Sequence, residues 1–201
     1  MKPKLLILCS LLFLAAPRMQ AQRFSCNLEW GFSGTVYTFH SSHYTTVDGY
    51  HMDPRYYDNL FHTHGFVSLR TGIRAGRRLS VDFCTGYYGL QYELRSIPAG
   101  LRATWDFGKD PDGAGLLGYA EGGIGFSDET WEKNADYARI GAGWRVPLGE
   151  GISLKFLFSG QLSMAHPVPY DPFDDMYVDP ARLSRSDRIC MALSVSMAIG
   201  F

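Results

Sequence analysis

The chain has 201 residues, of which 46% are hydrophobic, 14% aromatic and 19% charged. The chain has 19 Lys and Arg residues and 20 Asp and Glu residues, so it lacks the excess of positive charge that indicates nucleic-acid binding. The apolar and aromatic content excludes a disordered chain, and the 22 glycines follow no three-residue period, which excludes a collagen-like one. What remains is a globular or membrane protein of about one domain.

The first segment, residues 1–21, has the pattern of a secretory signal peptide. Two lysines precede an apolar run, Leu5–Ala16, and Ala21 supplies a small residue at the expected cleavage site. The run has 12 residues and is too short for a membrane helix, which needs about 20. We therefore expect removal of residues 1–21 and a single exported domain over 22–201.

Three cysteines remain in that domain, Cys26, Cys84 and Cys190. An odd number in an exported protein leaves at least one free thiol or implies pairing between chains. Their spacing matches no zinc motif.

Apolar and polar residues alternate along the rest of the chain, as in strands with two different faces. Eight strands are predicted, at 27–40, 65–75, 79–92, 96–107, 116–126, 136–148, 152–164 and 188–201. The last is the clearest, because one face is apolar and the other is small or polar throughout. Its apolar face consists of Ile189, Met191, Leu193, Val195, Met197, Ile199 and Phe201.

Alternation by itself also fits a soluble sandwich or a lipocalin-like barrel with an apolar interior. Connection lengths favour the inverted arrangement, in which the apolar face meets lipid. Short connections at 76–78, 109–115 and 149–151 alternate with long ones at 41–64, 127–135 and 165–184, and only a turn near Leu94-Arg95 breaks the trend.

Tryptophans and charges support the same choice. Trp30, Trp105 and Trp144 are predicted to lie outward at one rim, as in the interfacial aromatic girdle of a membrane barrel. The polar face carries charges of both signs, which need partners away from water and are expected to fill the lumen as a plug. They are Arg70, Arg74, Arg102, Arg139, Arg145, Lys155 and Arg188 with Glu29, Asp82, Asp106 and Glu121.

The signal peptide, the eight strands and the ending Val195-x-Met197-x-Ile199-x-Phe201 resemble a small outer-membrane β-barrel of the OmpA/OmpX-like class. The resemblance covers essentially all of residues 22–201 and carries no catalytic motif. It implies an all-β fold, an eight-stranded antiparallel up-and-down barrel in a Gram-negative outer membrane, with both termini in the periplasm. It also implies contact with outer-membrane lipid and lipopolysaccharide, and reading of the Phe201 signal by the barrel-assembly machinery. We expect a monomer without a cofactor, and without a peptidoglycan-binding domain after Phe201.

All six histidines fall at the expected extracellular end, together with several aspartates. They are His40, His43, His51, His62, His64 and His166, with Asp48, Asp53 and Asp58 in the first long loop. Imidazole and carboxylate bind transition metals, and His62 and His64 share one strand face, but no His-x-x-x-His pair is present. A metal site is therefore a minor alternative.

A hydrolase is the second alternative. His40 and Ser42 point the same way on an extended strand, and Asp48 would orient the imidazole. This arrangement would suit modification of lipid A, although it matches no family motif.

The last long loop, 165–184, is acidic, aromatic and stiffened by proline. Asp171, Asp174, Asp175 and Asp179 lack the spacing of a calcium-binding EF-hand. Rigid aromatics there suit contact with a partner or packing on the first loop. The glycines of Gly31-x-x-Gly34 and Gly122-Gly123-x-Gly125 lie in strands and make space in a narrow lumen.

The sequence thus predicts a structural, adhesive or surface-binding outer-membrane barrel with no catalytic, cofactor or metal residue assigned. A lipid-modifying hydrolase and a small channel are the alternatives.

Overall fold

The computed structural model describes residues 24–58, 61–91, 94–108, 110, 113–127, 133–149 and 151–201. The expected signal peptide, residues 1–21, lies outside the described residues.

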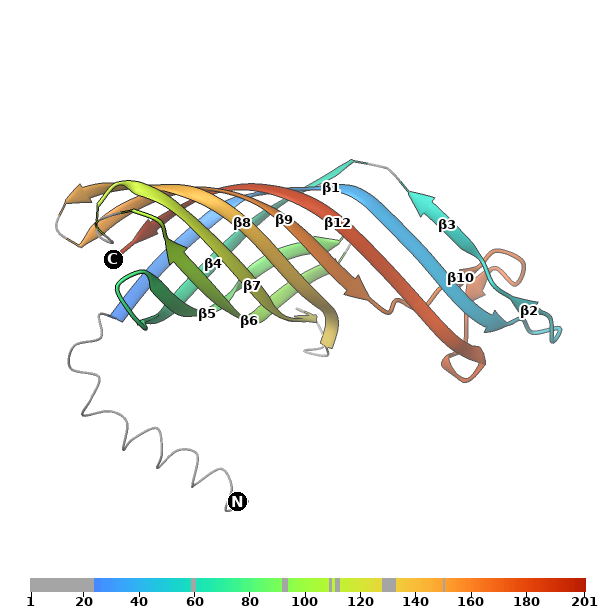
Figure 1. Ribbon diagram of the computed structural model, residues 1–201. Coiled ribbons are helices and arrows are strands. Elements are labelled where there is room, and N and C mark those ends of the chain that lie inside the picture. The colour runs from blue at the N-terminus through green and yellow to red at the C-terminus, as the bar shows by residue number, and fades with distance from the viewer. Residues whose placement is uncertain are drawn as a thin grey trace, which may run out of the picture.

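Within those residues, eight long strands form a closed antiparallel barrel (Figure 1). They are β1 (Phe24–Thr45), β4 (His62–Arg74), β5 (Leu79–Gln91), β6 (Leu94–Asp106), β7 (Gly115–Ser127), β8 (Lys133–Gly149), β9 (Ile152–Ala165) and β12 (Leu183–Gly200). Each strand pairs with the next along the chain, and β12 pairs with β1 to close the ring. The predicted all-β barrel is confirmed, and β6 begins at Leu94, two residues earlier than predicted.

The barrel is closed by backbone pairing between the two ends of the chain. Asn27 lies opposite Gly200, and the amides of Cys26 and Phe201 each donate to the other residue's carbonyl, at 3.2 and 2.8 Å. A bulge between Thr35 and Tyr37 shifts the β1–β12 register by one residue, after which pairing continues up to Tyr44 and Leu183. Both strands are therefore longer than predicted.

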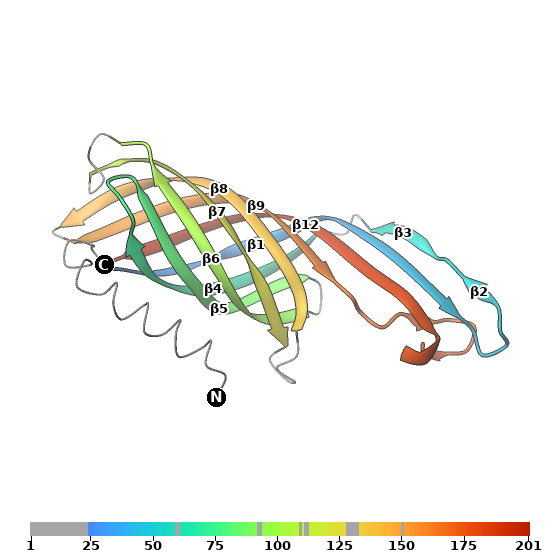
Figure 2. The same cartoon turned by 60° about the horizontal axis from the view of Figure 1, so that its bottom comes forward.

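The extra length of β1 and β12 projects from one end of the barrel as a ribbon (Figures 1 and 2). Short elements surround it: β2 (His51–Met52) and β3 (Arg55–Asp58) pair with β1, while β10 (Tyr170–Asp171) pairs with β11 (Met176–Tyr177). A 3-10 helix, η2 (Pro180–Arg182), precedes β12 and is capped by the Asp179 carboxylate. The two long connections are thus ordered structures around this ribbon end.

At the opposite end, which we call the turn end, Phe24 and Phe201 lie beside the turns that follow β4, β6 and β8. Trp105 and Trp144 lie on the outer surface near this end and are about half exposed. Indole rings favour the boundary between hydrocarbon and water. Their position agrees with the predicted aromatic rim.

The outer and inner faces of the strands differ as predicted for a membrane barrel. In β12, Met191, Leu193 and Val195 are exposed, whereas the alternating Ala192, Ser194 and Ser196 are buried. A lipocalin-like barrel would bury the apolar set instead. The barrel therefore presents an apolar exterior and a polar interior, the arrangement that suits lipid outside and polar groups inside.

No helix among the described residues is long and apolar enough to cross a membrane.

Candidate functional site

The interior of the barrel holds a network of buried charges. The guanidinium of Arg102 contacts Glu29 Oε2 at 2.8 Å and Glu121 Oε2 at 2.5 Å, and Arg70 contacts the same Glu29 oxygen at 3.1 Å. Arg139 donates to Gln161 Oε1 at 2.7 Å. These contacts give charges removed from water the partners that they need, so the predicted pairing is confirmed for Arg70 and Arg102 with Glu29 and Glu121.

Tyrosines complete this interior, and the sequence prediction missed them. Tyr88 and Tyr119 are buried, and Tyr137 donates its hydroxyl proton to Glu121 Oε1 at 3.0 Å. The Arg102 guanidinium lies 4.1 Å from the centre of the Tyr119 ring, and that of Arg139 lies 4.9 Å from the Tyr88 ring. Each tyrosine lies an even number of residues from a lumen charge on its own strand. That spacing could have placed it inside.

The ribbon end carries a cavity of about 550 Å³, which we call the cleft. One wall comes from β1 and from the segment that leads through β2 to β3, and the other from the last loop and the start of β12. Its lining is dominated by aromatic and proline side chains. Among them are Tyr44, Pro54, Tyr56, Pro167, Pro169, Tyr170, Phe173 and Tyr177, with His40, Asp187 and Arg188 as charged or titratable members.

His40 is held in the cleft by two partners. Its ring stacks on Tyr56 with 4.6 Å between the ring centroids, because β3 pairs with β1 directly opposite it. Its Nδ1 accepts a hydrogen bond from Arg188 Nε at 3.2 Å. His40 pairs with Arg188 between β1 and β12, and Arg188 also pairs with Ala165, the last residue of β9. Because β9 ends there, the two side chains lie where the ribbon leaves the barrel. Burial, followed by the charge of Arg188, lowers the pKa of His40 below its usual value.

The start of β12 fixes the last loop against the ribbon. Ser186 Oγ donates to the carbonyl of Pro167 at 2.5 Å, and His166 Nδ1 lies 3.0 Å from Asp187 Oδ1. Arg185 forms an ion pair with the other oxygen of Asp187. This bracing gives the proline-rich wall a defined position.

The first and last loops also contact each other directly. The amide of Val47 donates to Asp174 Oδ2 at 3.0 Å, although the two residues are 127 positions apart. Asp171 accepts from the Phe173 amide at 3.0 Å and so shapes the turn that brings Phe173 to the cleft. The predicted packing of the last loop on the first is confirmed.

The metal candidates do not form one site. Among the described residues, no three His, Cys, Asp or Glu side chains are grouped so that they could hold a metal ion. His43 lies 3.4 Å from Asp53, His51 Nδ1 lies 3.1 Å from Thr45 Oγ1, and His62 and His64 lie within β4. Arg55 and then His43 hold the pKa of the exposed Asp53 below its usual range.

The hydrolase candidates are placed differently from the prediction. The partners of His40 are Tyr56 and Arg188, while Asp48 lies in the turn beyond the end of β1. Ser42 is buried, and its amide donates to the Pro54 carbonyl at 3.2 Å. His40 and Ser42 both line the cleft, but the expected orienting carboxylate is not the partner of the imidazole.

The closed eight-stranded barrel, its apolar exterior and its buried polar lumen define the class of the protein. It has the fold of a small eight-stranded membrane β-barrel, with an apolar exterior that suits lipid and a polar lumen. The short turns and both chain ends lie at the turn end, opposite the cleft.

Comparison with solved structures finds similarity to small outer-membrane barrels at low sequence identity and with TM-scores below 0.5. Neisserial surface protein A is 10% identical, with 90% of this chain and 99% of that chain covered and a TM-score of 0.46. The N-terminal β-barrel domain of Pseudomonas aeruginosa OprF is 14% identical, with coverages of 88% and 97% and a TM-score of 0.43. Ail, the attachment invasion locus protein of Yersinia pestis, is 10% identical, with coverages of 89% and 99% and a TM-score of 0.22. No family model and no curated protein matches the sequence.

Proposed function

We propose that this protein is a surface-binding or adhesive barrel whose cleft holds a segment of an extracellular protein partner. The observation that carries the proposal is the assembly of one cavity from the first and last loops. The barrel anchors these loops in the membrane, and the long strands β1 and β12 raise them above it (Figure 2).

The chemistry of the cleft supports a polypeptide ligand. Tyr56, Tyr170 and Phe173 offer broad rings that lose little conformational entropy on binding, and the prolines hold their wall rigid. Arg188 and Asp187 supply one charge of each sign at the same cavity. Rigid aromatic anchors beside a few polar groups are the features that dominate protein recognition sites.

Two neighbouring tyrosines provide a matched test. Tyr56 stacks on His40 inside the cleft, whereas Tyr57 packs on Phe39 on the opposite face of the ribbon, with ring centroids 5.1 Å apart. Purified protein in detergent is applied to an array of immobilised extracellular polypeptides. We expect Tyr56→Ala to weaken retained binding by tenfold or more and Tyr57→Ala to leave it nearly unchanged.

Both variants need to keep the mobility shift on boiling that marks a folded barrel. Equal loss in the two variants, or retention of no polypeptide by the unaltered protein, overturns the proposal.

We further propose export by a cleaved signal peptide over residues 1–21 and insertion as a monomer into membrane that contains lipopolysaccharide. The outward-facing residues of β12 are apolar and lead to Phe201. This pattern supports recognition of the strand by the barrel-assembly machinery. Replacing Phe201→Ala should reduce the amount of boiling-sensitive barrel in the outer-membrane fraction. An unchanged amount contradicts this role.

A further inference from the structure

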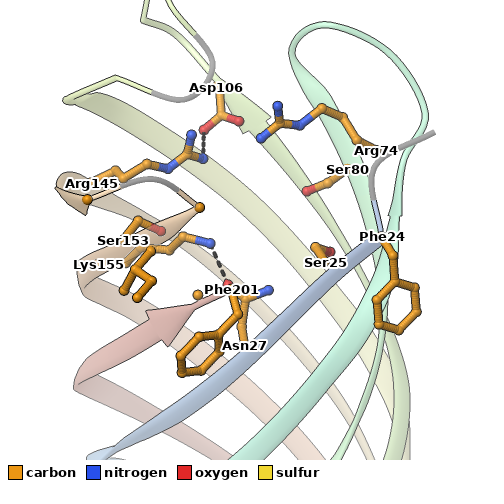
Figure 3. A pocket seen from close by; sticks show the side chains of 14 residues that line it. Phe24, Ser25, Asn27, Arg74, Ser80, Asp106, Arg145, Ser153, Lys155 and Phe201 are labelled. Carbon is orange, nitrogen blue, oxygen red and sulfur yellow. Dashed lines mark hydrogen bonds and ion pairs between the residues drawn. The ribbon is translucent and has the colours of Figure 1, made fainter. Parts of the chain in front are cut away.

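A second cavity lies at the turn end of the barrel, far from the cleft. It has a volume of about 680 Å³, and we call it the vestibule (Figure 3). Its walls come from β1, β4, β5, β6, β8, β9 and β12, so the closing of the ring is what creates it. The proposed extracellular binding function makes no use of it.

Positive charge predominates in the vestibule. Arg74, Arg145 and Lys155 line it, and Asp106 is the one acidic side chain among its lining residues. Figure 3 shows these side chains on different walls of one space, with Asp106 beside the Arg145 guanidinium, to which it is bonded. Asp82 lies behind the wall and accepts a hydrogen bond from Ser25 Oγ at 2.7 Å.

Lys155 forms an ion pair with neither of these carboxylates. Its Nζ donates to the neutral Asn27 Oδ1 at 2.5 Å (Figure 3). Among the described residues, no carboxylate lies within ion-pair distance of it. The half-buried ammonium therefore faces the cavity without a direct counter-ion, and an anion in the vestibule would supply one.

Hydrogen-bond donors and open space surround this ammonium group. The hydroxyls of Ser25, Ser80 and Ser153 line the same cavity. A Cβ atom built on Gly149 or Gly151 would meet nothing within 4 Å, so open space lies beside both of these lining residues. Ammonium, guanidinium and hydroxyl donors arranged around one space match the several acceptor oxygens of a phosphate group.

We propose that the vestibule binds a phosphate-class oxyanion, with Lys155 as its principal contact and Arg74 and Arg145 as supporting charges. The cavity is larger than one phosphate group and lies in the size range of small-molecule sites. The phosphate is therefore part of a larger molecule, either a soluble periplasmic phosphate compound or the headgroup of an inner-leaflet phospholipid.

Titration calorimetry with pyrophosphate on the folded protein in a zwitterionic detergent tests the soluble source. Vesicles of phosphatidylcholine with or without phosphatidylglycerol, observed by phosphorus NMR on the reconstituted barrel, test the headgroup source. We expect a Lys155-dependent signal in at least one of the two experiments, and the experiment that gives it identifies the source.

Three variants distinguish binding at this site from nonspecific attraction of an anion to a positively charged protein. Lys155→Gln should weaken binding by tenfold or more, and Lys155→Arg should retain most of it. Arg77→Gln removes the same charge from the exposed β4–β5 turn, outside the cavity lining, and should leave binding within about twofold.

Asn27→Asp provides a second test that keeps Lys155 in place. It would set a carboxylate beside Nζ and should weaken anion binding while the barrel stays folded. Absence of binding in both experiments, or equal weakening by Lys155→Gln and Arg77→Gln, overturns the proposal.

Discussion

Arg102 and Glu29 are 73 residues apart in sequence, yet their side chains meet at 2.8 Å in the centre of the barrel, and both are fully buried. Glu29 also accepts from Ser196 Oγ on β12 at 2.8 Å. This one carboxylate thus links β6 to the seam at which β1 and β12 close the ring. Its removal tests how much the lumen network contributes to stability.

We expect Glu29→Gln to destabilise the barrel by about 3–5 kcal/mol, the usual cost of breaking a buried pair and leaving its partner charge uncompensated. The urea midpoint of the refolded protein, followed by tryptophan fluorescence, measures the loss. Asp53→Asn breaks the exposed pair with Arg55 and should shift the midpoint little. Equal midpoints for the two variants would show that the buried network contributes no special stability.

The same network predicts the electrical behaviour of the lumen. Arg102 has no exposed surface, and Glu29, Glu121 and Tyr88 are buried as well. An eight-stranded barrel encloses little more than its own side chains. We expect no steady conductance in planar-bilayer recordings, and reproducible channel steps from the unaltered protein would support the channel alternative instead.

The lipid-facing surface predicts a dependence on depth in the membrane. Ile140 lies near the middle of β8 and is 71% exposed, while Leu148 lies on the same face at the turn end of β8 and is 60% exposed. Ile140→Arg should cost about 2–4 kcal/mol in vesicles and Leu148→Arg about 0–1 kcal/mol. Unfolding titrations in phospholipid vesicles compare the two, and equal costs would contradict this placement of the membrane.

An inward-facing glycine, Gly123, predicts a steric effect that the outward-facing Gly160 does not share. A Cβ atom on Gly123 would lie 2.5 Å from the Ala99 carbonyl oxygen and 2.6 Å from Gly100 Cα, whereas one on Gly160 would meet nothing within 4 Å. Gly123→Val should therefore cost about 1–3 kcal/mol through overpacking. Gly160→Val should be nearly neutral, and the same denaturant titration would detect a reversed order.

The ribbon predicts a dependence on pH. Burial, and to a smaller extent Arg188, lowers the pKa of His40, so the ordered ribbon binds a proton less readily than the opened one. The contact between β3 and β1 is therefore fully stable above the ordinary histidine pKa of about 6.5 and weakens as the pH falls below it.

Hydrogen exchange of the β3 amides, corrected for the intrinsic effect of pH, measures this opening. We expect faster exchange at acidic pH in the unaltered protein. In His40→Gln, exchange should lose this pH dependence, and a pH response that persists in the variant would assign it to another group.

Much of the fold could be predicted because its signal is local. Alternation along a strand assigns each residue to one face without reference to any other strand. It therefore identified the eight strands, the lipid-facing side chains and the lumen charges such as Arg102 and Glu121. It missed Tyr88 and Tyr137 in the lumen, because tyrosine is amphipathic and suits either face of such a strand.

The sequence by itself determined a two-faced, eight-stranded outer-membrane barrel with charges inside, since a period of two residues is written into each strand. Only the tertiary structure decided which charges meet, because the register between strands and the closure of the ring place Glu29 against Arg102. The cleft and the vestibule also depend on closure. Each gathers side chains from both ends of the chain, and no local pattern records which distant residues the ring will bring together.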